Sequence, residues 1–186
     1  MSSDEILLET EAAMEKAVDY MHHEFAAVRT GKASPALVEN VEVEAYGSNM
    51  RLKQLALITS PEARLLVIQP FDASTVKAIE RGIKESKVGI MPTVDGKIIR
   101  LRIPELSEER RRELVKTVKT MSEESRVRIR GFRRDGIDQL KKLEKESAIT
   151  EDDLRTLEKE VQELTDRFVK AIDEALTNKE AEILKV

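Results

Sequence analysis

Three stretches of the chain place apolar residues three and four positions apart, the spacing of one face of an α-helix. The first covers residues 4–29, the second begins at Ser107, and the third begins at Thr150. Ser2 with Glu5, and Thr150 with Asp153, have the spacing of N-terminal capping pairs. Three apolar stripes cannot all stay in water, so we predict that the three helices bury them in a bundle.

The second helix carries small residues on its apolar stripe. Ser122, Ser125 and Gly136 interrupt a row of larger apolar side chains. Because small side chains let two helix axes approach closely, we expect a neighbouring helix to lie against this stripe. The full stripe is Val115, Val118, Ser122, Ser125, Ile129, Phe132, Gly136, Leu140 and Leu143.

Residues 31–104 have a different pattern and hold all five prolines and five of the seven glycines. Apolar and polar residues alternate over 41–45 and 99–103, which predicts strands, the first of them exposed. Residues 65–68 are a short apolar run that fits a buried strand, and 74–87 have helical spacing. We therefore predict a small β/α/β domain inserted between the first and second helices.

The predicted fold class is α+β, with two domains. Residues 1–30 and 105–186 form the discontinuous three-helix bundle, and residues 31–104 form the inserted domain. Two connections join the domains, near Thr30–Lys32 and near Pro104–Ser107. Because both are short, we predict a hinge there, made of Thr30, Gly31, Lys32, Pro104 and Glu105.

The charges are spread unevenly along the chain, whose formal net charge is -4. Residues 31–104 hold 11 Lys and Arg against 8 Asp and Glu, so the bundle carries the negative excess. Within that acidic background, residues 126–134 read RVRIRGFRR and contain five arginines and no acid. A local basic segment in an acidic protein indicates docking at a defined place rather than general attraction to nucleic acid.

The arginines at 126, 130 and 133 lie on one helical face. Ile129 and Phe132 of the apolar stripe lie roughly 70–80° around the helix from them. A row of guanidinium groups beside a buried stripe suits a polyanion, and RNA backbone is the first candidate. The competing interpretation is a solvated face paired with acids of a neighbouring helix. Arg128 points elsewhere, and we expect it to be exposed to solvent.

Catalytic and cofactor motifs are lacking in the sequence. It contains neither the phosphate-binding loop pattern nor the dinucleotide-binding glycine pattern. His22 and His23 are adjacent, so a helix would point them about 100° apart, which does not suit a shared metal. There is no cysteine and no apolar run of 18 residues. We expect no cofactor, no metal, no enzymatic activity, and a protein of the cytoplasm without membrane segments.

Motifs in order along the whole chain resemble the bacterial ribosome recycling factors. The matching segments are Arg29–Pro35 (RTGKASP), Tyr46–Gly47, Leu52–Ala56 (LKQLA), Leu106–Arg111 (LSEERR), Arg126–Val127, Arg130, Arg133–Asp135 (RRD) and Lys179–Glu182 (KEAE). Each segment alone is a weak signal, but their order and spacing together are specific.

The resemblance implies an L-shaped protein of two domains that binds the post-termination ribosome across the sites that tRNA occupies. Its partners would be elongation factor G and the rRNA of the large subunit. With GTP hydrolysis by elongation factor G, such factors separate the subunits and release mRNA. The residues that match the family's rRNA-binding positions are Arg126, Arg130, Arg133 and Arg134, with Arg29 beside them if the bundle brings it alongside. The inserted domain would be the moving lever.

The sequence departs from the family near the hinge. Lys32 replaces a common arginine, and Arg102 and Glu105 stand where relatives often have proline. The alternative function is a helical adaptor or scaffold whose arginine row docks an acidic protein partner. We expect a monomer, because the bundle can bury its own stripes. We also expect Arg133→Glu to abolish recycling and leave thermal unfolding nearly unchanged.

Overall fold

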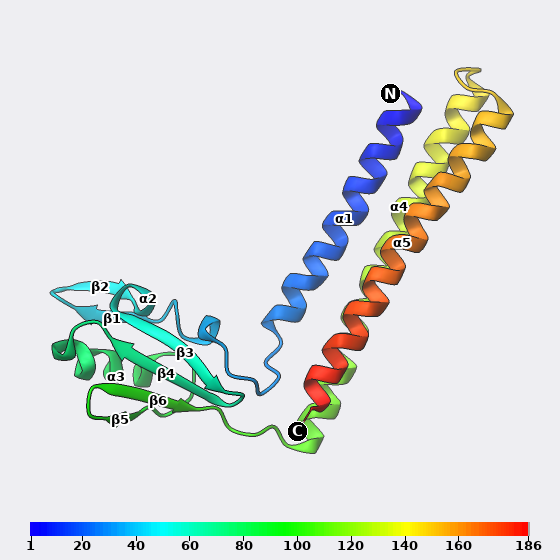
Figure 1. Cartoon of the computed structure of the whole chain (residues 1–186). Helices are drawn as coiled ribbons and strands as arrows, with labels where there is room; N and C mark the ends of the chain where they lie inside the picture. Colours follow the sequence, from blue (N-terminus) through cyan, green and yellow to red (C-terminus); the bar gives the residue numbers. More distant parts are fainter. Residues whose placement is uncertain (186) are drawn as a thin grey trace. The chain divides into compact units, whose positions relative to one another are not determined.

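A computed structural model describes residues 1–185 and divides the chain into two compact units. The helical unit comprises Met1–Thr30 and the chain from Glu108 to its end, and the inserted unit comprises Gly31–Ser107. Figure 1 shows helices in the first unit and a mixture of strands and short helices in the second. The predicted α+β class is therefore confirmed.

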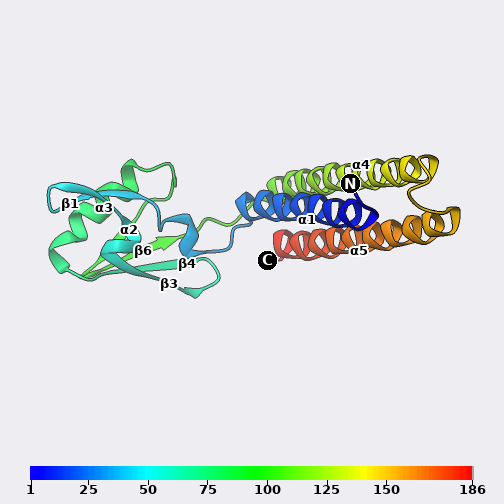
Figure 2. The ribbon, with the colours of Figure 1, turned by 90° about the horizontal axis from the view of Figure 1, so that it is seen from above.

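The helical unit consists of α1 (Ser3–Ala27), α4 (Glu108–Lys145) and α5 (Glu151–Leu184), which lie side by side in Figure 2. Both predicted capping boxes are present. The hydroxyl of Ser2 accepts from the backbone of Glu5, and that of Thr150 accepts from the backbone of Asp153. The hydrogen bond from the Thr150 backbone lowers the pKa of Asp153. The first helix ends two residues earlier than predicted, with Val28 as an extended cap.

The small residues of α4 allow α1 to approach it closely, as predicted. The Ser125 hydroxyl donates to the Ala17 carbonyl at 3.4 Å. A Cβ added to Gly136 would lie 2.7 Å from the Thr10 hydroxyl oxygen. The stripe of α4 is confirmed in most positions but starts from Leu114, with Val115 half-buried. Phe132, predicted to be in the core, is only half-buried.

The inserted unit contains two antiparallel sheets. The hairpin of β1 (Glu42–Ala45) and β2 (Ser48–Arg51) forms one sheet. The other has the order β3-β4-β6-β5. Its strands are β3 (Ala56–Glu62), β4 (Leu65–Pro70), β5 (Thr93–Asp95) and β6 (Ile98–Arg102). The helices are α2 (Leu52–Leu55) and α3 (Val76–Glu85), with 3-10 turns at Pro35–Leu37 and Ala73–Thr75.

The core of the inserted unit lies between α3 and the strands. Ile79 and Ile83 of α3 and Leu66, Ile68 and Leu101 of the central strands are fully or almost fully buried. The predicted strands at 65–68 and 99–103 and the predicted helix at 74–87 are confirmed. The strand at 41–45 was predicted to be exposed, which is wrong for Val43. That side chain is fully buried, because Gly82 of α3 approaches the strand closely.

The turn between β3 and β4 holds both connections to the rest of the chain. The Ala33 N–H donates to the Ala63 carbonyl at 2.7 Å, and the Ile103 N–H donates to the Arg64 carbonyl at 2.8 Å. The Arg64 guanidinium also pairs with Glu105 at 3.3 Å. The two backbone hydrogen bonds anchor the inserted unit at Ala33, near its start, and at Ile103, near its end. In the part of the chain described, no helix is long and apolar enough to span a membrane.

Candidate nucleic-acid interface

The arginine row lies on the side of α4 that faces α5. Arg126, Arg130 and Arg133 fall within about 60° of one another around the helix. Asp173 and Gln162 of α5 each contact one of them. Ile129 between them is fully buried and fixes the rotation of α4. We call this side the α5 flank of α4, defined by Arg126, Arg130 and Arg133.

Arg126 is more enclosed than Arg130, with 20% of its side chain exposed. Its Nε and Nη2 donate to Asp173 Oδ1 at 2.9 and 2.6 Å, and its Nη1 donates to Glu123 at 3.2 Å. Desolvation by burial alone would lower the pKa of Arg126. The hydrogen bonds to the two carboxylates outweigh that effect and raise the pKa. The cation is therefore permanent and held in one orientation.

Arg130 lies further out, with 48% of its side chain exposed. Its Nη2 donates to Glu123 Oε1 at 2.7 Å. Glu123 therefore accepts from two arginines, and the hydrogen bond to Arg130, followed by that to Arg126, lowers the pKa of Glu123. The sequence segment 126–134 contains no acid, but the structure supplies two, one from the preceding turn of α4 and one from α5. The structure thus supports the competing interpretation of the arginine row, in which its arginines pair with acids of the protein itself.

Arg133 donates from Nη1 to the side-chain oxygen of Gln162 at 2.9 Å, and Gln162 donates onward to Asp166 at 2.8 Å. Its Nε is buried and has no hydrogen-bond partner among residues 1–185. Because Arg133 is half-buried rather than exposed, replacing it perturbs packing as well as charge. Arg134 is exposed on the outer surface of α4.

Arg29 does not lie beside the row. The contacts of Ala17 with Ser125 and of Thr10 with Gly136 show that α1 runs antiparallel to α4. In that register the last residue of α1, Ala27, is level with about residue 117 of α4. With a rise of 1.5 Å per residue, that is about 14 Å before Arg126. Arg29 follows that end of α1 and is exposed.

The opposite side of α4, which faces α1, carries a different arginine. The guanidinium carbon of Arg128 lies 4.8 Å from the centroid of the Tyr20 ring. Half of Tyr20 is exposed, and Phe132 lies nearby in the lining of the same shallow hollow. We call this side the α1 flank, defined by Tyr20, Arg128 and Phe132. The prediction that Arg128 is exposed to solvent is confirmed, and its guanidinium also lies over the Tyr20 ring of α1.

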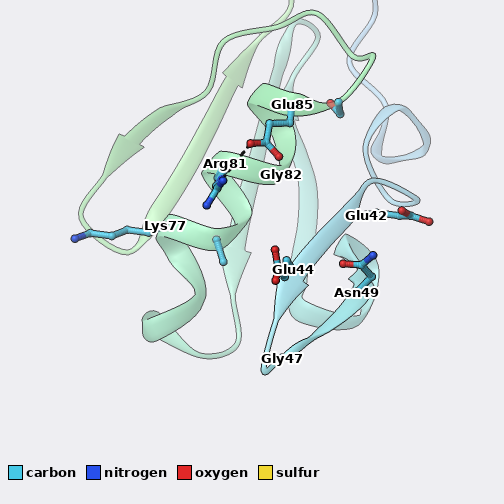
Figure 3. Close-up of a pocket in the computed structure, with 10 residues that line it drawn as sticks. Glu42, Glu44, Gly47, Asn49, Lys77, Arg81, Gly82 and Glu85 are labelled. Carbon is cyan, nitrogen blue, oxygen red and sulfur yellow. Dashed lines mark hydrogen bonds and ion pairs between the residues drawn. The ribbon is translucent and has the colours of Figure 1, made fainter.

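Figure 3 shows a hollow of about 760 Å³ between the β1–β2 hairpin and α3. Its lining mixes charges of both signs, and Arg81 is already paired with Glu85 at 3.1 Å. Lys77 points away from the hairpin. The hollow is open and has no cluster of one charge, so it is a weaker candidate for a polyanion than α4.

Among residues 1–185, no group of three or more His, Cys, Asp or Glu could hold a metal ion.

Comparison with known proteins identifies relatives over the full chain. The family model described as ribosome recycling factor matches residues 21–184. The ribosome-recycling factor of Akkermansia muciniphila is 55% identical and the alignment covers 100% of both chains. That of a Roseiflexus species is 51% identical over 98% of this chain and 99% of the relative.

The comparison with solved structures gives the same result as the comparison of sequences. A solution structure of the ribosome recycling factor matches with a TM-score of 0.76 and 41% identity, covering 100% of this chain and 99% of that one. A second match has a TM-score of 0.64 and 42% identity, covering 99% of this chain and 100% of that one. It comes from models of the T. thermophilus ribosome recycling factor and the E. coli elongation factor G bound to the E. coli post-termination complex.

Proposed function

The chain belongs to the ribosome recycling factor family, and we propose that it recycles ribosomes after termination. It binds the post-termination ribosome and, with elongation factor G and its GTP hydrolysis, promotes separation of the subunits and release of mRNA. The observation that carries this proposal is the similarity to named recycling factors over the entire length of both chains. Both units of the structure are therefore covered by the comparison.

The residues that hold the chain on the ribosome are those of the α5 flank together with Arg134, and they contact phosphates of large-subunit rRNA. Arg126 and Arg133 are held by partners on α5, so their guanidinium groups are positioned before RNA arrives. Exposed ion pairs contribute only about 0–1 kcal/mol, so exchanging Glu123 for a phosphate at Arg130 costs little. Phosphate contacts position a protein without reading base sequence. Arg29 provides a separate contact near the end of α1.

The inserted unit is the lever that elongation factor G moves. The hinge comprises Thr30, Gly31, Lys32, Pro104 and Glu105. Gly31 has a φ of +79°, a conformation that side chains with a Cβ rarely adopt. The turn at Ala63–Arg64 secures both connections on the side of the inserted unit, which confines rotation to a few residues. Short connecting segments of this kind are typical of hinges.

The chain contributes binding to the ribosome, and elongation factor G carries out the GTP hydrolysis. The protein acts in the cytoplasm, where post-termination ribosomes are found, and acts as a monomer.

One observation favours the adaptor alternative. Arg126 already binds a carboxylate of α5, so the α5 flank accepts acidic side chains with good geometry. An acidic protein partner would exploit the same chemistry. The two functions differ in their binding partner, since an adaptor has no affinity for ribosomes.

Subunit separation can be followed by light scattering, using post-termination complexes, the chain, elongation factor G and GTP. We expect separation only when all are present, and none with a GTP analogue that cannot be hydrolysed. The control is Arg155→Glu, which reverses a 72%-exposed arginine of α5 outside the proposed site and should act like wild type. Scattering that stays constant with the complete mixture would reject the recycling function.

A further inference from the structure

Tyr20 and Arg128 form an exposed cation–π pair on the α1 flank. The guanidinium carbon lies 4.8 Å above the ring centroid, and 49% of Tyr20 remains exposed. A guanidinium that stacks on a ring with one face keeps its other face for a second planar group. Nucleobases stack on aromatic rings and on arginine planes in this manner.

The hollow beside the pair has the size and lining for such a group. Its volume is about 430 Å³, and its lining includes the alanines Ala12, Ala13 and Ala17 of α1 and Phe132 of α4. Small side chains on α1 leave the space that a planar ring requires. Lys16 and Arg128 contribute two positive charges to the lining against the single acid Glu9. The hollow therefore combines apolar surface with a positive excess, which suits a base attached to its phosphate.

The outer surface of α4 leaves a path from this hollow to the α5 flank. Gly131 lies between the two flanks, and a Cβ added there would have nothing within 4 Å. The backbone of α4 is therefore open to close approach at this position. A strand whose base enters the hollow can cross α4 at Gly131 and place its next phosphates near Arg130 and Arg134.

We propose that Tyr20, Arg128 and Phe132 form a stacking site for one unpaired base of large-subunit rRNA. This inference rests on the proposed function and adds a base contact to the phosphate contacts of the α5 flank. Stacking depends weakly on ionic strength, whereas the arginine–phosphate contacts depend on it strongly. The two flanks thus contribute differently to binding and can be separated by experiment.

The first test places a photoreactive phenylalanine analogue at position 20 of the full-length chain, bound to post-termination ribosomes. The expected product is a crosslink to one unpaired nucleotide of large-subunit rRNA. The control carries the analogue at Tyr46, the other tyrosine of the chain, which is 67% exposed in the inserted unit. Ribosome binding by the labelled chain, with a position-20 crosslink to protein, to mRNA or to nothing, overturns the inference and leaves the recycling function intact. Failure of wild type to bind ribosomes overturns both.

The second test measures affinity for large subunits across a salt series. We expect Tyr20→Ala to weaken binding about 5- to 150-fold, the range measured for one base stacked on an aromatic ring, without changing the salt slope. Tyr20→Phe keeps the ring and should bind like wild type. If Tyr20→Ala instead lowers the unfolding temperature and leaves affinity unchanged, the pair only joins α1 to α4 and the inference is wrong.

Discussion

The two flanks of α4 use arginine in opposite ways. On the α5 flank, the guanidinium edges of Arg126 and Arg130 donate to carboxylates. On the α1 flank, the planar face of Arg128 rests on the Tyr20 ring, 4.8 Å from its centroid. Both flanks belong to the same nine residues of one helix. The comparison shows that the side chains around an arginine, on α4 itself and on the neighbouring helix, decide whether its edge or its face is available to a partner.

The side chains of α5 and α1 that face α4 contribute to the difference. Asp173 and Gln162 place oxygen acceptors beside α4. The facing part of α1 presents alanines and one aromatic ring instead. An oxygen acceptor orients the N–H groups of a guanidinium, and a ring orients its plane. We therefore expect phosphate on one flank and a base on the other.

The largest effect should come from disturbing the spacing of α1 and α4, on which the α1 flank depends. Gly136→Val adds atoms where a Cβ alone lies 2.7 Å from the Thr10 hydroxyl. We expect a loss of about 2–4 kcal/mol in the free energy of unfolding, through overpacking. Urea denaturation measures it. Gly131→Ala is the matched control, because open space surrounds it and alanine favours the helix by up to ~1 kcal/mol. Equal stability of the two variants would contradict the close packing of α1 on α4.

Charge reversal within the α5 flank should lower activity strongly but affect stability unequally. Arg133→Glu removes a half-buried side chain and its bond to Gln162, so we expect at least a 10-fold lower rate of subunit separation and a loss of about 1 kcal/mol in stability. Arg130→Glu should lower the rate similarly with little change in stability, because nearly half of that side chain is exposed. The expectation from the sequence that Arg133→Glu leaves unfolding unchanged thus needs revision. Full activity in Arg130→Glu would show that the α5 flank is not part of the rRNA-binding site.

Removing an acid of the α5 flank should act in the opposite direction. Asp173→Asn withdraws the carboxylate that accepts two hydrogen bonds from Arg126 and leaves that cation for phosphate. We expect affinity for large subunits to rise about 2- to 5-fold at low salt, as befits a partly exposed ion pair worth up to ~1 kcal/mol. Asp152→Asn, on the first turn of α5, is the control and should bind like wild type. A loss of affinity in Asp173→Asn would show that the positioning of Arg126 by Asp173 outweighs the competition of Asp173 with phosphate.

The smallest effect concerns pH. The pKa of Glu123 is lowered in the folded chain by its hydrogen bonds to Arg130 and Arg126. A lowered pKa stabilises the fold above the unfolded value of about 4.3, and this contribution is lost as pH falls through the folded pKa. Glu123→Gln should therefore be slightly less stable than wild type at pH 7 and equally stable near pH 3. Urea midpoints measured at both values test this. If the difference in stability between Glu123→Gln and wild type persists at pH 3, its cause is not the ionisation of Glu123.

The helical unit was largely predictable because its signals are local. Periodicity located all three helices, and the spacing of Ser2 with Glu5 and Thr150 with Asp153 located two of their starts. The inserted unit was predicted less completely. β3 was missed because most of its residues are exposed and it contains Pro61, so neither alternation nor a buried run marks it. Its pairing with β4 is a tertiary effect.

The arginine row was visible in the sequence, but its partners were not. Asp173 lies 47 residues from Arg126, and no local pattern links them. Tyr20 and Arg128 meet only because α1 packs against α4, so sequence reasoning missed the α1 flank. An exposed aromatic residue beside the apolar stripe of the first helix was the one available signal.

Co-sedimentation with bacterial large ribosomal subunits across a salt series tests the central claim, that the α5 flank holds the chain on rRNA. The comparison is between wild type and the double variant Arg130→Glu/Arg133→Glu, with Arg155→Glu as the charge-reversal control. We predict that wild type and the control bind with an affinity that falls steeply with salt, whereas the double variant binds at least 100-fold more weakly with a shallower slope. Equal binding and equal salt slopes for all three would contradict the claim.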